Sequence, residues 1–227
     1  METLSFDLSR TSVREVNQRL HRATAAGCTV DIANPDGAHN LAVGLNAPMH
    51  VTIHGHAGYY AAGMNKHATV LIDGSASTGV AENMMSGSVR VKGFASNAAG
   101  ASAHGGLLVV DGDAGLRCGI SLKGADIVVG GSVGSFTGFM AQAGRIVICG
   151  DAGDALGDSL YEAVIYVRGK IASLGADARI EALGDADVAA LTQLLAAADR
   201  NYDAREFKRV TSARSLYHWN ADAAQEY

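Results

Sequence analysis

The sequence predicts an all-β protein, a right-handed parallel β-helix of about seven or more coils, capped by an N-terminal helix and by a C-terminal helix plus tail. Three observations predict it. Glycines recur at a constant interval of 19 residues, each glycine follows a short strand of alternating apolar residues, and helical patterns flank the repeats on both sides. The repeated glycines are Gly55, Gly74, Gly93, Gly112, Gly131, Gly150 and Gly169.

The segment before the repeats predicts one helix and one strand. Ser12 and Glu15 have the spacing of a capping box, and Val13, Val16 and Leu20 continue at helical spacing to about Ala25. A first strand is expected over 28–32, and the regular coils begin at 51.

Each coil is predicted to carry one strand that buries two side chains. Val51-Thr-Ile53 precedes the first glycine, and Ile165-Tyr-Val167 precedes the last, so alternate residues point into the coil. Because the interval never changes, every coil follows the same path and equivalent residues stack. Small residues further along each coil, including Gly100, Gly119, Gly138 and Gly157, are expected at corners where a positive φ or a missing Cβ lets the chain turn.

Other repeat architectures fit less well. A left-handed hexapeptide helix needs an aliphatic residue at every sixth position, but Ala57 and Gly63 occupy these positions after Val51. The core pattern of leucine-rich repeats is absent, and propeller blades run to about 40 residues per repeat.

After the last coil, residues 185–195 return to a helical period, and an aromatic and basic tail follows from Tyr202. We therefore expect two parts: residues 1–183 with the N-terminal capping helix and the β-helix, and residues 184–227 with the C-terminal helix and a partner-docking tail. The open sheet edges at the two ends of the stack need covers, and the terminal helices are the expected ones.

One outward-facing column is apolar over the later coils and needs a cover. Two covers are possible: the helix carrying Val188, Leu191, Leu194 and Leu195, or another protein chain. If the stripe is an interface, it and the tail supply the candidate partner-contacting residues: Val109, Val128, Val147, Tyr166, Phe207, Arg209, Tyr217 and Trp219.

The other outward column contains Asp73, Lys92 and Asp111 one coil apart. As a charged site, this column would be the only candidate for an independent β-helix enzyme. The alternative is a solvated face with weak ion pairs.

Composition excludes several classes of function. The formal charge of −5 and the pI near 5.9 argue against binding to nucleic acid or to an anionic membrane. No apolar run has the length of a membrane span, and the start lacks the pattern of a secretory signal, so a cytoplasmic location is expected. The odd number of dispersed cysteines, 3, fits reduced buried thiols.

No self-contained active site is predicted. His54 and His56 lack an obvious further metal ligand, and Cys118 and Cys149 lie where the repeat places small packing residues. The glycines of 150–158 are explained by the coil, and the aspartates there would repel a phosphate. We therefore expect no catalytic, cofactor-binding or metal-binding residues in this chain.

The glycine-centred repeat resembles the GXGXG β-helix domain found at the C-terminus of the glutamate synthase large subunit and in the β-helix subunit of formylmethanofuran dehydrogenase. The resemblance covers about 30–182. The segments 144–171, Glu206-Phe-Lys-Arg209 and Ser212-Ala-Arg-Ser-Leu-Tyr217 look like the free-standing form, the small β-helix subunit of N-methylglutamate synthase and its glxC-type relatives.

This resemblance implies a non-catalytic scaffold between two partners, a class II glutamine amidotransferase-like subunit and a glutamate synthase-like subunit that binds FMN and an iron–sulfur cluster. The complex would convert methylamine and glutamate to N-methylglutamate and ammonia. The alternatives are a scaffold like the β-helix subunit of formylmethanofuran dehydrogenase and an independent β-helix enzyme.

Overall fold

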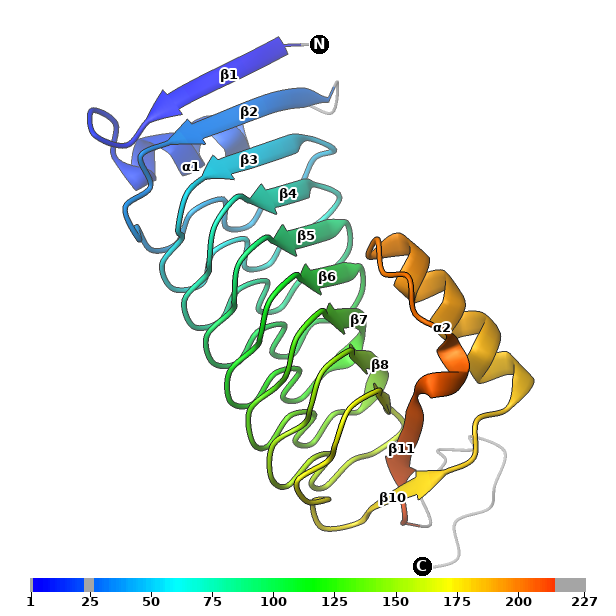
Figure 1. The fold of residues 1–227 in the computed structure, drawn as a ribbon. Coiled ribbons are helices and arrows are strands. Elements are labelled where there is room, and N and C mark those ends of the chain that lie inside the picture. The colour runs from blue at the N-terminus through cyan, green and yellow to red at the C-terminus, as the bar shows by residue number, and fades with distance from the viewer. Residues whose placement is uncertain (1, 23–26, 215–227) are drawn as a thin grey trace, which may run out of the picture.

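The computed structural model describes residues 2–22 and 27–214, which form a parallel β-solenoid (Figure 1). Strands β1 to β9 lie side by side in chain order and are all parallel, and the connections between them form the remaining faces of the coils. The strands are β1 (Glu2–Asp7), β2 (Cys28–Ala33), β3 (His50–His54), β4 (Thr69–Ile72), β5 (Ser88–Val91), β6 (Leu107–Val110), β7 (Lys123–Val129), β8 (Ala143–Ile148), β9 (Val164–Val167), β10 (Ala178–Glu181) and β11 (Lys208–Ser212).

The strand register confirms the 19-residue repeat. Val51 pairs with Val70, and each later pair down to Ile146 with Ile165 keeps the same interval. The step from β2 to β3 is longer by two residues, since Val30 pairs with Val51. The inward residues of every strand from β2 to β9 are buried and form one continuous core.

The repeated glycines stack directly on one another, as predicted. Gly93 donates its backbone N–H to the carbonyl of Gly74 at 2.8 Å, and the same bond recurs down to Gly169 and Gly150 at 3.0 Å. A Cβ built on Gly74 would lie 2.5 Å from the backbone of Gly55. The missing Cβ therefore permits the close approach of successive coils.

The later corner glycines have a different role. Gly119 has a φ of +66°, and a Cβ there would lie 2.5 Å from Cδ1 of Ile146. Gly100 and Gly138 are in the same situation against Ile127 and Ile165. These positions need both the left-handed backbone conformation and the absence of a side chain.

Helix α1 (Val13–His21) caps the N-terminal end, and its capping box between Ser12 and Glu15 is formed as predicted. The Asn17 side chain donates to the carbonyl of Asn40 and accepts from the backbone N of Ala42, so it makes the hydrogen bonds that a preceding coil would otherwise make. Strand β1, which pairs with β2, was not predicted, because its residues lie outside the 19-residue repeat.

The C-terminal helix is also confirmed, as α2 (Asp185–Ala197). It lies along the outer side of the sheet beside the later strands (Figure 1), so it covers a face and not the end of the stack. The end is extended by the tail: after the short 3₁₀ helix η1 (Ala204–Glu206), strand β11 pairs antiparallel with β9, and β10 pairs with β11.

Candidate functional site

The outward apolar stripe is covered by the chain's own C-terminal segment. Val109, Val128, Val147 and Tyr166 form a second core cluster with residues of α2, η1 and Phe207, and all of these are buried. On the helix, Leu191, Leu194 and Leu195 supply the opposing surface. The covering helix predicted from Val188, Leu191, Leu194 and Leu195 is therefore confirmed, with Val188 partly buried at the edge.

This burial corrects the candidate partner-contacting residues. The four stripe residues and Phe207 have no free surface for another chain, because α2 and η1 already occupy it. Arg209 is paired within the chain to Asp187, at 3.0 Å, and to Glu181. Tyr217 and Trp219 lie outside the described residues.

A polar network fixes the start of α2 on the sheet. The Tyr166 hydroxyl donates to Oδ1 of Asp187 at 2.7 Å, and the other carboxylate oxygen of Asp187 accepts from the backbone N of Gly184 at 2.9 Å. Burial alone would raise the pKa of Asp187, but the hydrogen bonds from Tyr166 and Gly184 and the charge of Arg209 bring the pKa below its usual value. The carboxylate of Asp187 is thus held ionised between two elements.

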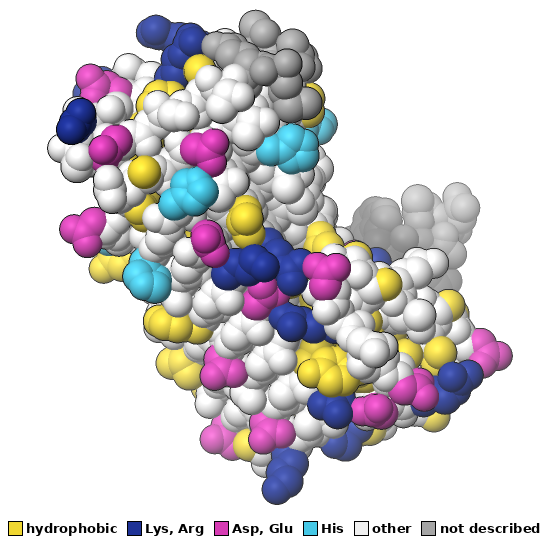
Figure 2. Space-filling model, turned by 45° about the horizontal axis from the view of Figure 1, so that its top comes forward, with side chains coloured by type: hydrophobic (Ala, Val, Ile, Leu, Met, Phe, Trp, Pro, Cys, Tyr) yellow, Lys and Arg dark blue, Asp and Glu magenta, His cyan; other side chains and the backbone are white. Residues whose placement is uncertain are grey.

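A second network fixes the end of α2. Asp111 accepts two hydrogen bonds from the Arg90 guanidinium, at 2.9 and 3.1 Å, and one from Arg200 Nη2 at 2.6 Å. Arg90 also pairs with Asp199, just beyond the helix. Figure 2 shows basic and acidic side chains gathered in the middle of this side of the molecule.

These contacts show what role each member of the outward column Asp73, Lys92 and Asp111 has in the structure. Lys92 Nζ lies 3.9 Å from Asp111, whereas Asp73 is exposed. Asp111 is mostly buried and neutralised by arginines, which is a helix-docking role rather than that of a free catalytic carboxylate. Asp111 therefore fits neither of the two expectations from the sequence, a catalytic charged site or a solvated face with weak ion pairs.

The histidines of the His54-x-His56 pair face different partners. His54 Nε2 lies 2.8 Å from Asp31 Oδ1, and His56 Nδ1 accepts from the backbone N of Ser75. The His56 contact begins a ladder in which a side chain caps the backbone N–H one coil further on, repeated from Asp113 to Ser132 and from Asp151 to Lys170. Within residues 2–22 and 27–214, no group of three or more His, Cys, Asp or Glu side chains is placed to hold a metal.

The thiols of all three cysteines are buried, and burial disfavours the reactive thiolate form. Burial raises the pKa of Cys118 to about 12. Burial also raises the pKa of Cys149 to about 11, against the opposing charges of Arg200 and Arg168. Cys28 is buried in β2.

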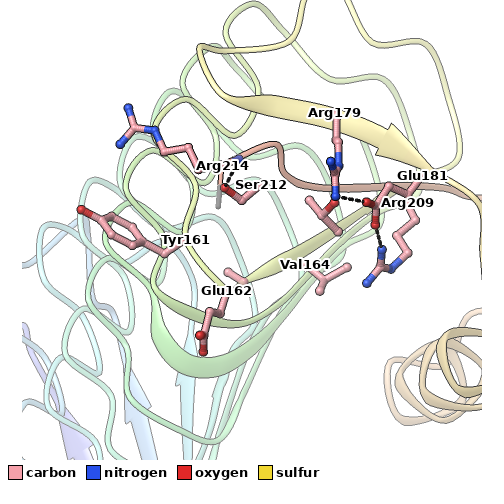
Figure 3. Close-up of a pocket in the computed structure, with 10 residues that line it drawn as sticks. Tyr161, Glu162, Val164, Arg179, Glu181, Arg209, Ser212 and Arg214 are labelled. Atoms are coloured by element: carbon pink, nitrogen blue, oxygen red, sulfur yellow. Dashed lines mark hydrogen bonds and ion pairs between the residues drawn. The ribbon is translucent and has the colours of Figure 1, made fainter. Parts of the chain in front are cut away.

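A cavity of about 570 Å³ opens at the C-terminal end of the stack (Figure 3). Arg179 and Arg209 converge on Glu181, while Arg214 pairs with Asp177 outside the cavity. Since carboxylates of the same chain neutralise each of these arginines, the charge available to a bound anion is small.

Sequence reasoning missed two features of the glycine pattern. Gly87, Gly106 and Gly144 form a further column with positive φ, in which a Cβ would lie 2.3 to 2.5 Å from a carbonyl of the preceding coil. Gly130 leaves space for Arg200, whose Nη2 would be 2.5 Å from a Cβ at that position. The spacing of 19 between Gly87 and Gly106 is a sequence signal that could have revealed this column. No sequence signal marks Gly130, which is a single residue.

Comparison with known proteins identifies the family. The chain is 50% identical to Protein GlxC of Rhizobium meliloti (strain 1021) over 225 residues, which span 98% of this chain and 99% of that protein. This chain belongs to the GlxC family. The finding confirms the resemblance to the glxC-type proteins. No family model and no solved structure matches the chain.

No helix among the described residues is long and apolar enough to cross a membrane.

Proposed function

We propose that this member of the GlxC family is a non-catalytic scaffold subunit of a glutamate-synthase-like complex. The observation that carries the proposal is that Asp111, the two histidines and the buried thiols already have structural roles, while Asp73 is an exposed carboxylate isolated among the described residues. Asp111 holds α2, His54 and His56 join neighbouring coils, and Cys118 and Cys149 are buried in the two cores. A full-length relationship to GlxC and the resemblance of the repeat to the glutamate synthase domain support the same proposal.

The complex is N-methylglutamate synthase, in which methylamine and glutamate give N-methylglutamate and ammonia. A class II amidotransferase-like subunit handles the amino-group donor, and a second partner holds FMN and an iron–sulfur cluster. The thiols of this chain do not fit an iron–sulfur site, because they are buried and not gathered. Its contribution is a rigid body on which the two partners are held in the cytoplasm.

Co-expression tests the proposal. The three chains are produced together with an affinity tag on this one, and the eluate is analysed by native mass spectrometry. We expect a complex that contains both partners, and we expect the partners to lose their mutual association when this chain is left out. Elution of the tagged chain without either partner would overturn the proposal.

A further inference from the structure

The side of the solenoid away from α2 carries an exposed apolar cluster that the scaffold proposal does not explain. We define the turn patch as Leu116, Ile120, Phe136, Phe139 and Met140, which lie on two successive coils. The Phe136 and Phe139 rings contact edge to face with centroids 6.0 Å apart, and Phe136 is 42% exposed. Large apolar side chains that gather on a surface mark an interaction site.

The coil that carries the two phenylalanines has no charged side chain. From 127 to 144 the chain contains no Asp, Glu, Lys or Arg. Depletion of charge together with enrichment of aromatic residues, Met and Arg is the compositional signature of the centre of a protein–protein interface.

Opposite charges flank this coil on its two sides. Arg117 N donates to the carbonyl of Ser135, and Phe136 N donates to the carbonyl of Asp154, so Arg117 lies on the coil before Phe136 and Asp154 on the coil after it. Ala155 occupies the position equivalent to Phe136, and Asp154 is its neighbour in the chain. Arg117 and Asp154 are exposed. Every other described arginine from residue 28 onward forms an ion pair with a carboxylate, and Arg117 forms none.

The backbone at Phe136 is also unfavourable for its side chain. Phe136 has a φ of +58°, a conformation that the equivalent residues Ala98, Arg117 and Ala155 share and that Gly79 adopts three coils earlier. A bulky residue in the left-handed region costs energy within the folded chain, and a glycine would not. The exposed part of the Phe136 ring therefore adds little to the stability of the folded chain.

We propose that the turn patch is the self-association surface of this protein and that its occupant is a second copy of the chain. A two-fold axis through Phe136 reverses the direction of the stack, so the coil of Arg117 meets the coil that bears Asp154 of the other copy. Both charge pairs are then satisfied, and the two phenylalanine-bearing coils meet at the axis. With Arg117 and Asp154 on opposite sides of the uncharged coil, the patch is complementary to itself only in this antiparallel arrangement.

Charge exchange between two variants tests this arrangement. We expect the purified chain to sediment as a dimer at tens of micromolar, and Arg117→Asp and Asp154→Arg each to raise the dimer dissociation constant at least about tenfold. A mixture of the two variants restores dimers, because each interface then holds one native pair and one exchanged pair. Monomers of the unaltered chain at these concentrations would overturn the proposal, as would failure of the mixture to associate better than either variant alone.

Two further variants separate association from folding. Phe136→Gly removes the central ring and relieves the backbone, so we expect monomers with an unchanged or higher melting temperature. Met85→Ser, at a residue that is 47% exposed and outside the patch, serves as the matched control and leaves the dimer intact. If Phe136→Gly remains dimeric, or if the patch variants disturb only binding to the proposed partner subunits, the self-association surface is contradicted. The scaffold proposal is tested independently by co-elution.

Discussion

At the scale of single residues, the glycines of the 19-residue repeat meet two different physical requirements, the absence of a Cβ and a positive φ. Gly74 needs the absence of a Cβ because the backbone of Gly55 lies directly beside it, whereas Gly119 also needs a positive φ. The sequence predicts the positions from the interval alone. It cannot separate the two requirements, because both are satisfied by the same residue and differ only in what packs nearby.

Replacing Gly119 with alanine tests this packing. The new Cβ would lie 2.5 Å from Cδ1 of Ile146 in a left-handed backbone, and we expect a loss of about 2–4 kcal/mol in the free energy of unfolding. Ile146→Val removes the opposing atom and alone costs about 1 kcal/mol.

The double variant is therefore expected to recover part of the loss, with a coupling of about 1 kcal/mol in a double-mutant cycle measured by chemical denaturation. Strict additivity of the two substitutions would contradict the contact between them.

The buried thiols give a second prediction at this scale. Because burial raises the pKa of Cys118 to about 12 and that of Cys149 to about 11, thiolate is scarce at neutral pH. In the native protein we expect slow reaction of all 3 cysteines with Ellman's reagent at pH 8, and rapid reaction after unfolding. A thiol that reacts rapidly in the native protein would show an accessible site that the structure does not contain.

At the scale of elements, the docking of α2 was predictable in outline. The apolar outward residues from Val109 to Tyr166 required a cover, and Leu191, Leu194 and Leu195 supplied one at helical spacing. The polar anchors were not predictable, because Asp187, Arg209 and Tyr166 are far apart in sequence and meet only after β11 joins the sheet. Strand β11 lacks a strong alternating pattern, since its position depends on pairing with β9. Strand β1 alternates at Leu4 and Phe6, but it lies outside the 19-residue repeat.

Asp187→Asn tests the anchor at the start of α2. The substitution keeps an acceptor for Tyr166 but removes the charge that faces Arg209, and we expect a loss of about 1–2 kcal/mol in unfolding free energy at pH 7. The lowered pKa of Asp187 means that the carboxylate stabilises the fold above its unfolded pKa and that this contribution is lost as pH falls through the folded value.

The stability difference between the unaltered chain and Asp187→Asn should therefore shrink as pH falls below about 4. Denaturant unfolding between pH 2 and pH 7 measures it. A stability difference that stays constant over this pH range would show that the substitution does not act through the charge of Asp187.

At the scale of the whole molecule, the solenoid is a continuous stack of coils whose outward apolar stripe is covered by its own C-terminal segment. The period predicted the stack, and the 50% identity to Protein GlxC over 98% of the chain shows the family. The turn patch was not predicted as a surface. Phe136 and Phe139 sit among glycines and small residues, and their exposure depends on which side of the coil they face.

Formation of N-methylglutamate from labelled methylamine by the reconstituted subunits tests the scaffold account most directly. We expect no product from this chain alone, loss of product when it is omitted from the other two, and full recovery when either the unaltered chain or Cys118→Ala is added back. Product formed by the isolated chain, or an unchanged rate without it, would contradict the account.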